Sequence, residues 1–213
     1  MTQATEPVIT LDRFKKGKTF QQYLESGIRN RELFEDNYKG LTVSAEQTAA
    51  LKELAARPNG PHHMVVIGED WCPDVYRGAG VAQKIAEAAG IEMRFFERDQ
   101  NKDMMAGYLK DGEFESIPVY IIYDKDHNEI THFIERPKLA NEQIHLTREV
   151  LGDMTPEGIA KRLGHAPSEE EVAAARAEGR EKYMKWQRES EIWAGWRVAA
   201  VDEVIANMRA KLG

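Results

Sequence analysis

The chain has 213 residues, of which 42% are hydrophobic and 31% charged, so it can bury a normal core and keep a well-hydrated surface. Its formal net charge of −7, without a basic block, argues against a nucleic-acid backbone or an anionic membrane as partner. One cysteine excludes an internal disulfide, and no segment resembles a signal core or a transmembrane helix. We therefore expect a soluble cytoplasmic protein whose single thiol stays free.

Two helices are predicted before the first strand. Residues 1–12 are expected to form a loose tail, and the apolar spacing over residues 20–28 predicts a first helix. Ser44 and Gln47 have the spacing of a capping box, which predicts the start of a second helix. The Pro-Asn-Gly-Pro turn at residues 58–61 closes this helical segment.

The central part of the chain alternates between strand and helix patterns. In chain order we predict a strand at 63–68, a helix at 73–89, a strand at 91–97, a short helix at 104–110, and strands at 119–123 and 130–134. Strands separated by helices imply parallel pairing, whereas the polar turn at 124–128 makes the last two strands an antiparallel hairpin.

The chain after Pro137 is predicted to be helical again. Ser168 and Glu171 form a further capping-box pattern, which opens a long helical stretch to about Leu212. Two glycines within this stretch, Gly179 and Gly195, are the places where we expect the helix to be interrupted.

Four large aromatic residues lie in this C-terminal stretch: Tyr183, Trp186, Trp193 and Trp196. The favoured interpretation is that they pack the long helix against the rest of the protein. The alternative is a surface for a partner or for a homodimer through the C-terminal helices, because Trp and Tyr are common interface anchors.

The only cysteine, Cys72, falls between a predicted strand and a predicted helix. Pro73 suits the first turn of a helix, and the partial positive charge at a helix start favours thiolate over thiol. The charge of Asp74 opposes thiolate formation. A reactive thiol and a buried, inert cysteine therefore both remain open interpretations.

A second motif stands at the start of the third predicted strand. Pro118 follows Ile117, and a proline can begin a strand, often as a cis peptide in a tight corner. An ordinary turn proline is the alternative.

Together, the two motifs in this order of elements resemble the thioredoxin family. Residues 71–75 (WCPDV) stand where that family carries Trp-Cys-x-x-Cys, and residues 116–119 (SIPV) resemble its cis-proline loop. The stretch EDWC further resembles a bacterial branch of thioredoxin-like proteins. The resemblance covers about residues 60–137 and implies a thioredoxin-like α/β fold, with a central mixed sheet flanked by helices.

The expected division of the chain has three parts. Residues 1–60 form an N-terminal helical extension, residues 61–165 the thioredoxin-like domain, and residues 166–213 a C-terminal helical extension.

The resemblance also implies roles for individual residues. Cys72 matches the attacking thiol, and Trp71 matches the aromatic flank of the site. Pro118 matches the proline that shapes the substrate groove, Ile117 would offer backbone groups to an extended peptide, and Pro73 completes the predicted substrate-binding set.

Two departures from the family pattern limit what carries over. Val75 replaces the second, resolving cysteine, so dithiol reductase activity is not expected. Val66 stands where thioredoxins bury an acid that assists proton transfer, a role for which Glu69 or Asp70 would be the substitute.

Two functions of different class remain open. The first is a monothiol thiol–disulfide oxidoreductase, which uses glutathione or another low-molecular-weight thiol as co-substrate and acts on a protein or a small disulfide. The second is a non-catalytic thioredoxin-fold binding or interaction module. We expect no bound cofactor. We also expect no metal, because the adjacent His62 and His63 point to opposite faces of a strand and cannot bind one ion together.

Overall fold

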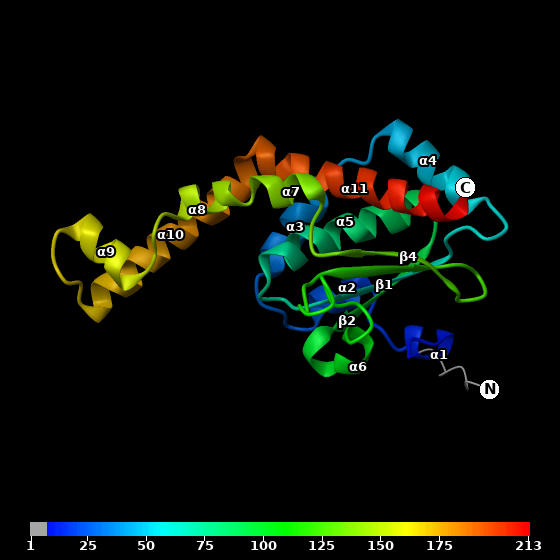
Figure 1. The fold of residues 1–213 in the computed structure, drawn as a ribbon, viewed down its shortest axis with the longest axis horizontal. Helices are drawn as coiled ribbons and strands as arrows, with labels where there is room; N and C mark the ends of the chain where they lie inside the picture. Colours follow the sequence, from blue (N-terminus) through cyan, green and yellow to red (C-terminus); the bar gives the residue numbers. More distant parts are fainter. Residues whose placement is uncertain (1–7) are drawn as a thin grey trace. The chain divides into compact units, whose positions relative to one another are not determined.

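The computed structural model describes residues 8–213, which form two compact units (Figure 1). The first unit contains the chain up to Arg136 and returns for residues 197–213, and the second contains residues 137–196. The expected tail over residues 1–12 lies partly outside the described residues. The prediction of a loose tail is wrong for residues 11 and 12, because Leu11–Phe14 forms a short helix, α1, capped by the Thr10 side chain.

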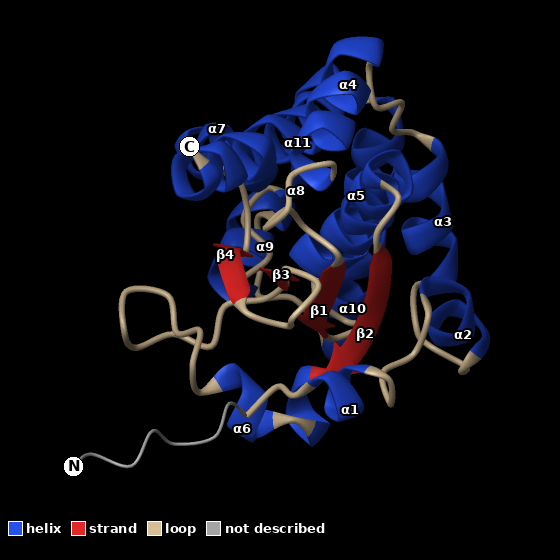
Figure 2. Ribbon diagram, turned by 90° about the vertical axis from the view of Figure 1, so that its right-hand side faces the viewer, coloured by secondary structure: helices blue, strands red, loops and turns tan. Residues whose placement is uncertain are grey.

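A four-stranded sheet forms the centre of the first unit, in the order β2-β1-β3-β4 (Figure 2). Strand β1 (His63–Gly68) pairs in parallel with β2 (Glu92–Glu97) and antiparallel with β3 (Val119–Tyr123). Strand β4 (Glu129–Ile134) completes the sheet as an antiparallel partner of β3. All residues of β1 and β3 are buried, which explains why both read as continuous apolar runs.

The direction of β3 corrects the expectation that strands separated by helices pair in parallel. The helix before β3 is α6 (Lys102–Met105), which has four residues and ends before most of the predicted range 104–110. Four helical residues advance the chain by about 6 Å, whereas a six-residue strand spans about 20 Å. The segment after β2 therefore stays at one edge of the sheet, and β3 starts where β1 ends, with Ile67 opposite Val119.

Three helices of the first unit, α2, α4 and α5, follow recognisable local signals. Helix α2 (Phe20–Glu25) and helix α4 (Ala45–Ala55) both begin with a capping box, and the one at Ser44 and Gln47 confirms the prediction. Helix α3 (Arg31–Lys39) was not predicted. Helix α5 (Pro73–Ala89) has the predicted bounds and ends at Gly90, whose positive φ of 72° suits glycine.

These helices pack on the sheet and on one another through aromatic and polar contacts. Tyr23 of α2 stacks on Phe95 of β2 with ring centroids 3.8 Å apart. The last helix, α11 (Glu191–Leu212), reaches the first unit from Arg197 onward. There, Arg197 donates to the Asn37 side chain at 2.9 Å.

The second unit contains α7 (Lys138–Gln143), α8 (His145–Leu151), α9 (Pro156–Leu163), α10 (Glu169–Glu189) and the first residues of α11. The capping box of Ser168 and Glu171 is confirmed at the start of α10. The predicted interruptions at Gly179 and Gly195 are wrong, because both glycines lie inside helices.

The helical stretch breaks at Ser190 instead. Its backbone leaves the helical region (φ −77°, ψ 125°), and its hydroxyl accepts hydrogen bonds from the N–H groups of Ile192 and Trp193 at 3.2 and 3.4 Å. A serine that caps the following helix can end one helix and start the next.

The four C-terminal aromatic residues form one cluster in the second unit. Ring centroids of neighbouring members lie 5.4–6.1 Å apart, and Trp193 and Trp196 are buried. The indole N–H of Trp196 donates to the Gln143 side chain at 2.8 Å, which satisfies its polar group. The rings therefore pack on one another within the second unit. Packing of the long helix on the rest of the protein and a homodimer through these helices both stay predictions.

Two glycines of α5 permit close packing around the helix. A Cβ atom on Gly78 would lie 2.4 Å from the Tyr120 hydroxyl and 2.7 Å from Pro118 Cγ, and one on Gly80 would lie 2.8 Å from the Tyr38 backbone nitrogen. Helix packing therefore explains the glycines of the Gly-Ala-Gly stretch at 78–80.

We expect Gly78→Ala to destabilise the protein by about 1–3 kcal/mol, because the added methyl group has no room beside Tyr120 and Pro118. Urea unfolding followed by circular dichroism measures this change. Gly195→Ala is the matched control, since a Cβ there meets nothing within 4 Å, and it should be neutral or stabilising by up to about 1 kcal/mol. Equal stability of the two variants would contradict the packing argument.

Candidate functional site

The two motifs singled out in the sequence meet at one edge of the sheet. Cys72 is the N-cap residue of α5 and is partly exposed. Its sulfur lies 3.8 Å from the carbonyl oxygen of Ile117, and the peptide bond between Ile117 and Pro118 is cis. The antiparallel direction of β3 causes this meeting, since β1 ends and β3 begins at the same edge.

The surroundings of Cys72 favour the thiol over the thiolate. Burial raises the pKa of the thiol most, and the negative charge of Asp74 raises it further. The backbone N–H groups of Val75 and Asp74 and the charge of Arg77 lower the pKa, but less than burial and Asp74 raise it. Of the two interpretations that the sequence leaves open, these surroundings favour the less reactive thiol, because desolvation outweighs the helix dipole here.

An ion-pair network anchors Asp74 at the start of α5. Its carboxylate pairs with Arg77 at 2.6 Å, in the same helix, and with Arg136 at 3.2 Å, just after β4. Arg136 also pairs with Glu135, which in turn pairs with Lys110. Sequence reasoning missed this network. The i, i+3 spacing of Asp74 and Arg77 was its one local signal.

Trp71 flanks the site and is 44% exposed. The guanidinium carbon of Arg98 lies 5.3 Å from the centre of the Trp71 ring, which is a cation–π arrangement. Arg98 also donates to the backbone carbonyl of Glu115 at 3.3 Å, two residues before Ile117. It therefore links the loop after β1 to the loop that leads into β3.

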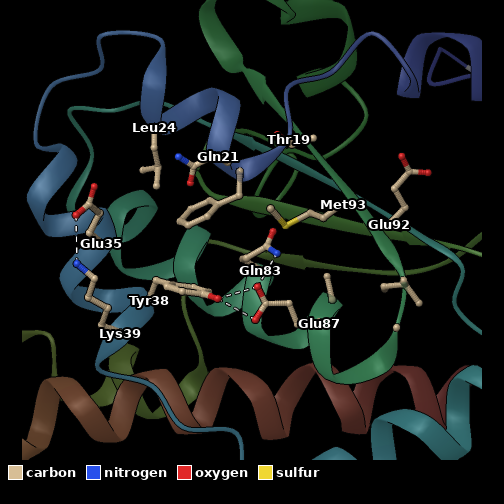
Figure 3. A pocket seen from close by; sticks show the side chains of 14 residues that line it. Thr19, Gln21, Leu24, Glu35, Tyr38, Lys39, Gln83, Glu87, Glu92 and Met93 are labelled. Atoms are coloured by element: carbon tan, nitrogen blue, oxygen red, sulfur yellow. Dashed lines mark hydrogen bonds and ion pairs between the residues drawn. The ribbon is translucent and has the colours of Figure 1, made fainter.

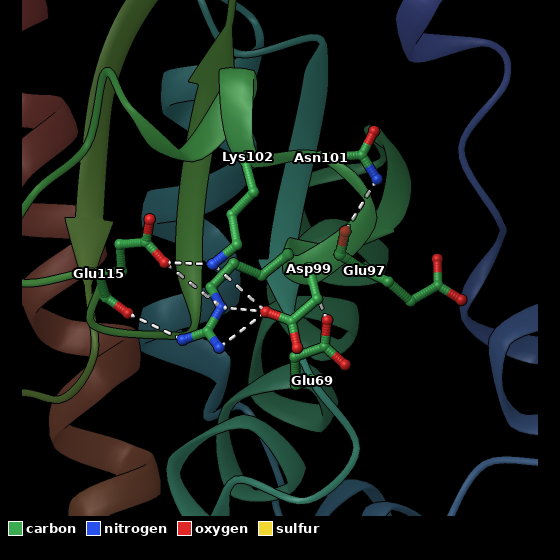
Figure 4. Close-up of polar contacts among 7 residues, drawn as sticks. Glu69, Glu97, Asp99, Asn101, Lys102 and Glu115 are labelled. Carbon is green, nitrogen blue, oxygen red and sulfur yellow. Dashed lines mark hydrogen bonds and ion pairs between the residues drawn. The ribbon is translucent and has the colours of Figure 1, made fainter.

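Figure 4 shows the polar contacts around this link. The Lys102 ammonium lies 2.5 Å from the Glu115 carboxylate and 3.4 Å from that of Asp99. The Glu69 carboxylate accepts a hydrogen bond from the Asp99 backbone at 2.8 Å. These contacts hold together the segments that follow β1, follow β2 and precede β3.

The two acids considered for proton transfer have different surroundings. Burial is the largest of the causes that raise the pKa of Glu69, and the hydrogen bond from the Asp99 backbone lowers that pKa. Asp70 pairs with Arg29 at 3.3 Å and accepts a hydrogen bond from the Arg29 backbone at 2.6 Å. Position 66, where thioredoxins bury an acid, holds a fully buried valine in this chain. A proton-transfer role for Glu69 or Asp70 stays a prediction.

The remaining predicted substrate-binding residues differ in accessibility. Pro73 is exposed in the first turn of α5, whereas Pro118 is buried against Gly78. The side chain of Ile117 is buried, and its carbonyl faces the thiol of Cys72. Phe114, which sequence reasoning did not single out, is 53% exposed in the loop before this proline.

The described residues contain no group of three or more metal-ligating side chains. His62 is exposed and His63 is buried, so the two rings of this tempting pair face different surroundings. Among the described helices, none has both the length and the apolar character needed to cross a membrane.

Comparisons with known proteins place the fold in a family. The family model described as thioredoxin matches residues 17–150, which begins well before the first strand. No curated protein sequence matches the chain significantly. A protein of unknown function from Pseudomonas aeruginosa has a similar crystal structure, with a TM-score of 0.61, 16% identity, and coverage of 95% of this chain and 98% of that one.

A second similar structure is an HIV epitope-scaffold, with a TM-score of 0.57 and 17% identity over 92% of this chain and 95% of that chain. At these identities the likeness concerns the fold alone. The family match covers more than half of the chain and includes the site at Cys72 and Pro118. The chain therefore belongs to the thioredoxin family.

Proposed function

We propose that the protein is a monothiol thiol–disulfide oxidoreductase whose nucleophile is Cys72. The observation that carries the proposal is the position of the Cys72 sulfur, partly exposed at the start of α5 and 3.8 Å from the Ile117 carbonyl. In this position the sulfur can be reached from solvent, and an extended substrate could lie along the start of β3.

The proposed reaction has two exchange steps. The Cys72 thiolate attacks one sulfur of a substrate disulfide, the S–S bond breaks, and the other sulfur leaves as a thiolate. Because position 75 holds valine, an outside thiol must then attack the mixed disulfide and release Cys72. This second step leaves one substrate sulfur in a mixed disulfide with the outside thiol. A second equivalent of the outside thiol attacks that bond, so that the substrate disulfide ends as two thiols and two equivalents of the outside thiol end as one disulfide.

The proposal implies partners and surroundings. The outside thiol would be glutathione or another low-molecular-weight thiol, and the substrate a protein or small disulfide. Trp71, Pro73, Ile117 and Pro118 would line the groove around Cys72. A reducing compartment such as the cytoplasm would supply the outside thiol and keep Cys72 reduced.

One observation favours the second candidate, a non-catalytic binding module. A thiol whose pKa is raised by burial and by Asp74 is mostly protonated at neutral pH and attacks disulfides slowly. The two candidates therefore differ in whether Cys72 exchanges at all under physiological conditions.

The pH dependence of alkylation tests the surroundings of the thiol. Cys72→Ser is the blank. We expect the rate of alkylation by iodoacetamide to keep rising with pH beyond about pH 8.5, the pKa of a free thiol, because the pKa of Cys72 is raised. A plateau below that pH would contradict this account of the thiol.

Exchange itself tests the proposed function. The wild-type protein is incubated with oxidised glutathione and then with excess reduced glutathione, and its mass is followed. The oxidoreductase proposal predicts one glutathione per chain, which forms at Cys72 and is then removed. No adduct on the folded protein, or an adduct that reduced glutathione leaves in place, would favour the binding module.

A further inference from the structure

A cavity of about 560 Å³ lies in the first unit, between α2, α3, the last turns of α5 and the start of β2 (Figure 3). It is remote from the thiol site. Glu87, on its wall, is fifteen residues along α5 from Cys72, which corresponds to about 22 Å of helix. The volume falls in the range of small-molecule sites.

The floor of the cavity is apolar. Its buried lining includes Phe20 and Leu24 of α2, Ala86 of α5 and Met93 of β2. Apolar lining with a few converging polar groups is typical of sites for small organic molecules.

The polar groups converge on Glu87. Its carboxylate accepts hydrogen bonds from the Tyr38 hydroxyl at 2.8 and 3.0 Å and from the Gln83 side chain at 2.9 Å, as Figure 3 shows. A carboxylate has about four acceptor positions, so Glu87 is held in place and can still accept a further donor.

The charges around the cavity single out the same residue. Of the three carboxylates in the lining, Glu35 pairs with Arg31 and Lys39, and Glu92 pairs with Arg94. Within residues 8–213, Glu87 forms no ion pair.

Within the described residues, the cations near Glu87 form no direct ion pair with it. The neighbouring cation, Lys84, lies over the Tyr38 ring at 4.0 Å. The end of α5 at Gly90 also lines the cavity, and the carbonyl end of a helix favours positive charge.

We propose that this cavity binds a small aromatic amine, whose apolar body lies on the floor and whose ammonium group donates to Glu87. An organic anion of the same shape would instead face Glu87 and the carbonyl end of α5. The proposal does not depend on the chemistry of Cys72.

Binding can be measured by ¹H–¹⁵N NMR on the full-length protein with 2-phenylethylamine as the probe. We expect saturable shifts of the amides of Leu24, Tyr38, Gln83 and Glu87. The isosteric anion 3-phenylpropionate should bind about five-fold more weakly, or more weakly still, because one exposed charge pair is worth up to about five-fold and the anion replaces that attraction by repulsion. Cys72→Ser should bind the amine like the wild type.

Two variants test separately whether binding depends on the Glu87 charge and on access to the apolar cavity. Glu87→Gln should weaken binding of the amine by about two- to five-fold, whereas Glu46→Gln, an equal charge change on α4, should have no effect. Gln21→Trp places a large ring at an exposed lining position and should block the cavity.

Spectra of the unliganded variants establish that each is folded. The proposal is wrong if no saturable shift occurs up to about 10 mM amine, which corresponds to negligible affinity. It is equally wrong if the anion binds as well as the amine, or if folded Gln21→Trp binds like the wild type.

Discussion

Asp74→Asn is expected to make Cys72 several-fold more reactive toward iodoacetamide at pH 7. The Asp74 charge is one cause of the raised pKa of the thiol, and its removal lowers that pKa. The substitution also releases Arg77 and Arg136 from their shared partner, so their positive charge can act on the thiolate. A more acidic thiol is a weaker nucleophile, but the gain in thiolate fraction is larger.

The same substitution should cost stability. Asp74 lies in the first turn of α5, where a negative charge is favourable, and its loss leaves the buried Arg77 without this ion pair. We therefore expect a lower midpoint of urea unfolding together with faster alkylation. Glu46→Asn, an exposed first-turn acid on α4, is the control for the charge change and should leave the alkylation rate unchanged. Unchanged alkylation in folded Asp74→Asn would show that Asp74 does not govern the thiol.

A raised pKa affects both steps of the proposed exchange. The thiolate is scarce at neutral pH, which slows the attack on a substrate disulfide. Cys72 is also a poor leaving group once the mixed disulfide has formed, since thiols of higher pKa leave more slowly. The raised pKa is therefore expected to slow both exchange steps, and Asp74 is the side chain through which both rates can be changed.

The features that could be predicted from the sequence depend on local signals. The capping boxes at Ser44 and Ser168 were predicted because both partners lie within three residues of each other. The bounds of α5 were predicted because Pro73 and Gly90 mark its two ends.

Helix α3 was missed for the opposite reason. Its N-cap residue, Asn30, adopts a left-handed conformation and makes no capping hydrogen bond through its side chain, so the start of the helix carries no signature.

The features that could not be predicted depend on contacts between distant residues. The pairing of Asp74 with Arg136 joins residues 62 positions apart, and no local pattern relates them. The raised pKa of Cys72 follows from burial, which depends on the packed fold. The family resemblance located Cys72 and Pro118 but gave no information on their electrostatic surroundings.

Val75→Cys is expected to create dithiol activity that the wild type lacks. Positions 72 and 75 are three residues apart at the start of α5, where Cα atoms lie about 5 Å from each other, within the range that a disulfide requires. A second thiol at this distance would resolve a mixed disulfide intramolecularly, and such reactions have large effective concentrations. We expect reduction of insulin by dithiothreitol to be accelerated at least about ten-fold over the wild type.

The controls for this variant separate the thiol from the change in packing. Val75 is fully buried beside Gly68, so its replacement removes apolar contacts and should cost about 1 kcal/mol for either replacement. Val75→Ser carries a similar loss without a thiol, and Cys72→Ser combined with Val75→Cys carries the new thiol alone. If Val75→Cys is folded but reduces insulin no faster than either control, the edge of the sheet at Cys72 does not support disulfide exchange. Activity confined to Val75→Cys would mean that the fold still provides a working redox site, and that the absence of a resolving thiol is what restricts the natural protein to monothiol chemistry.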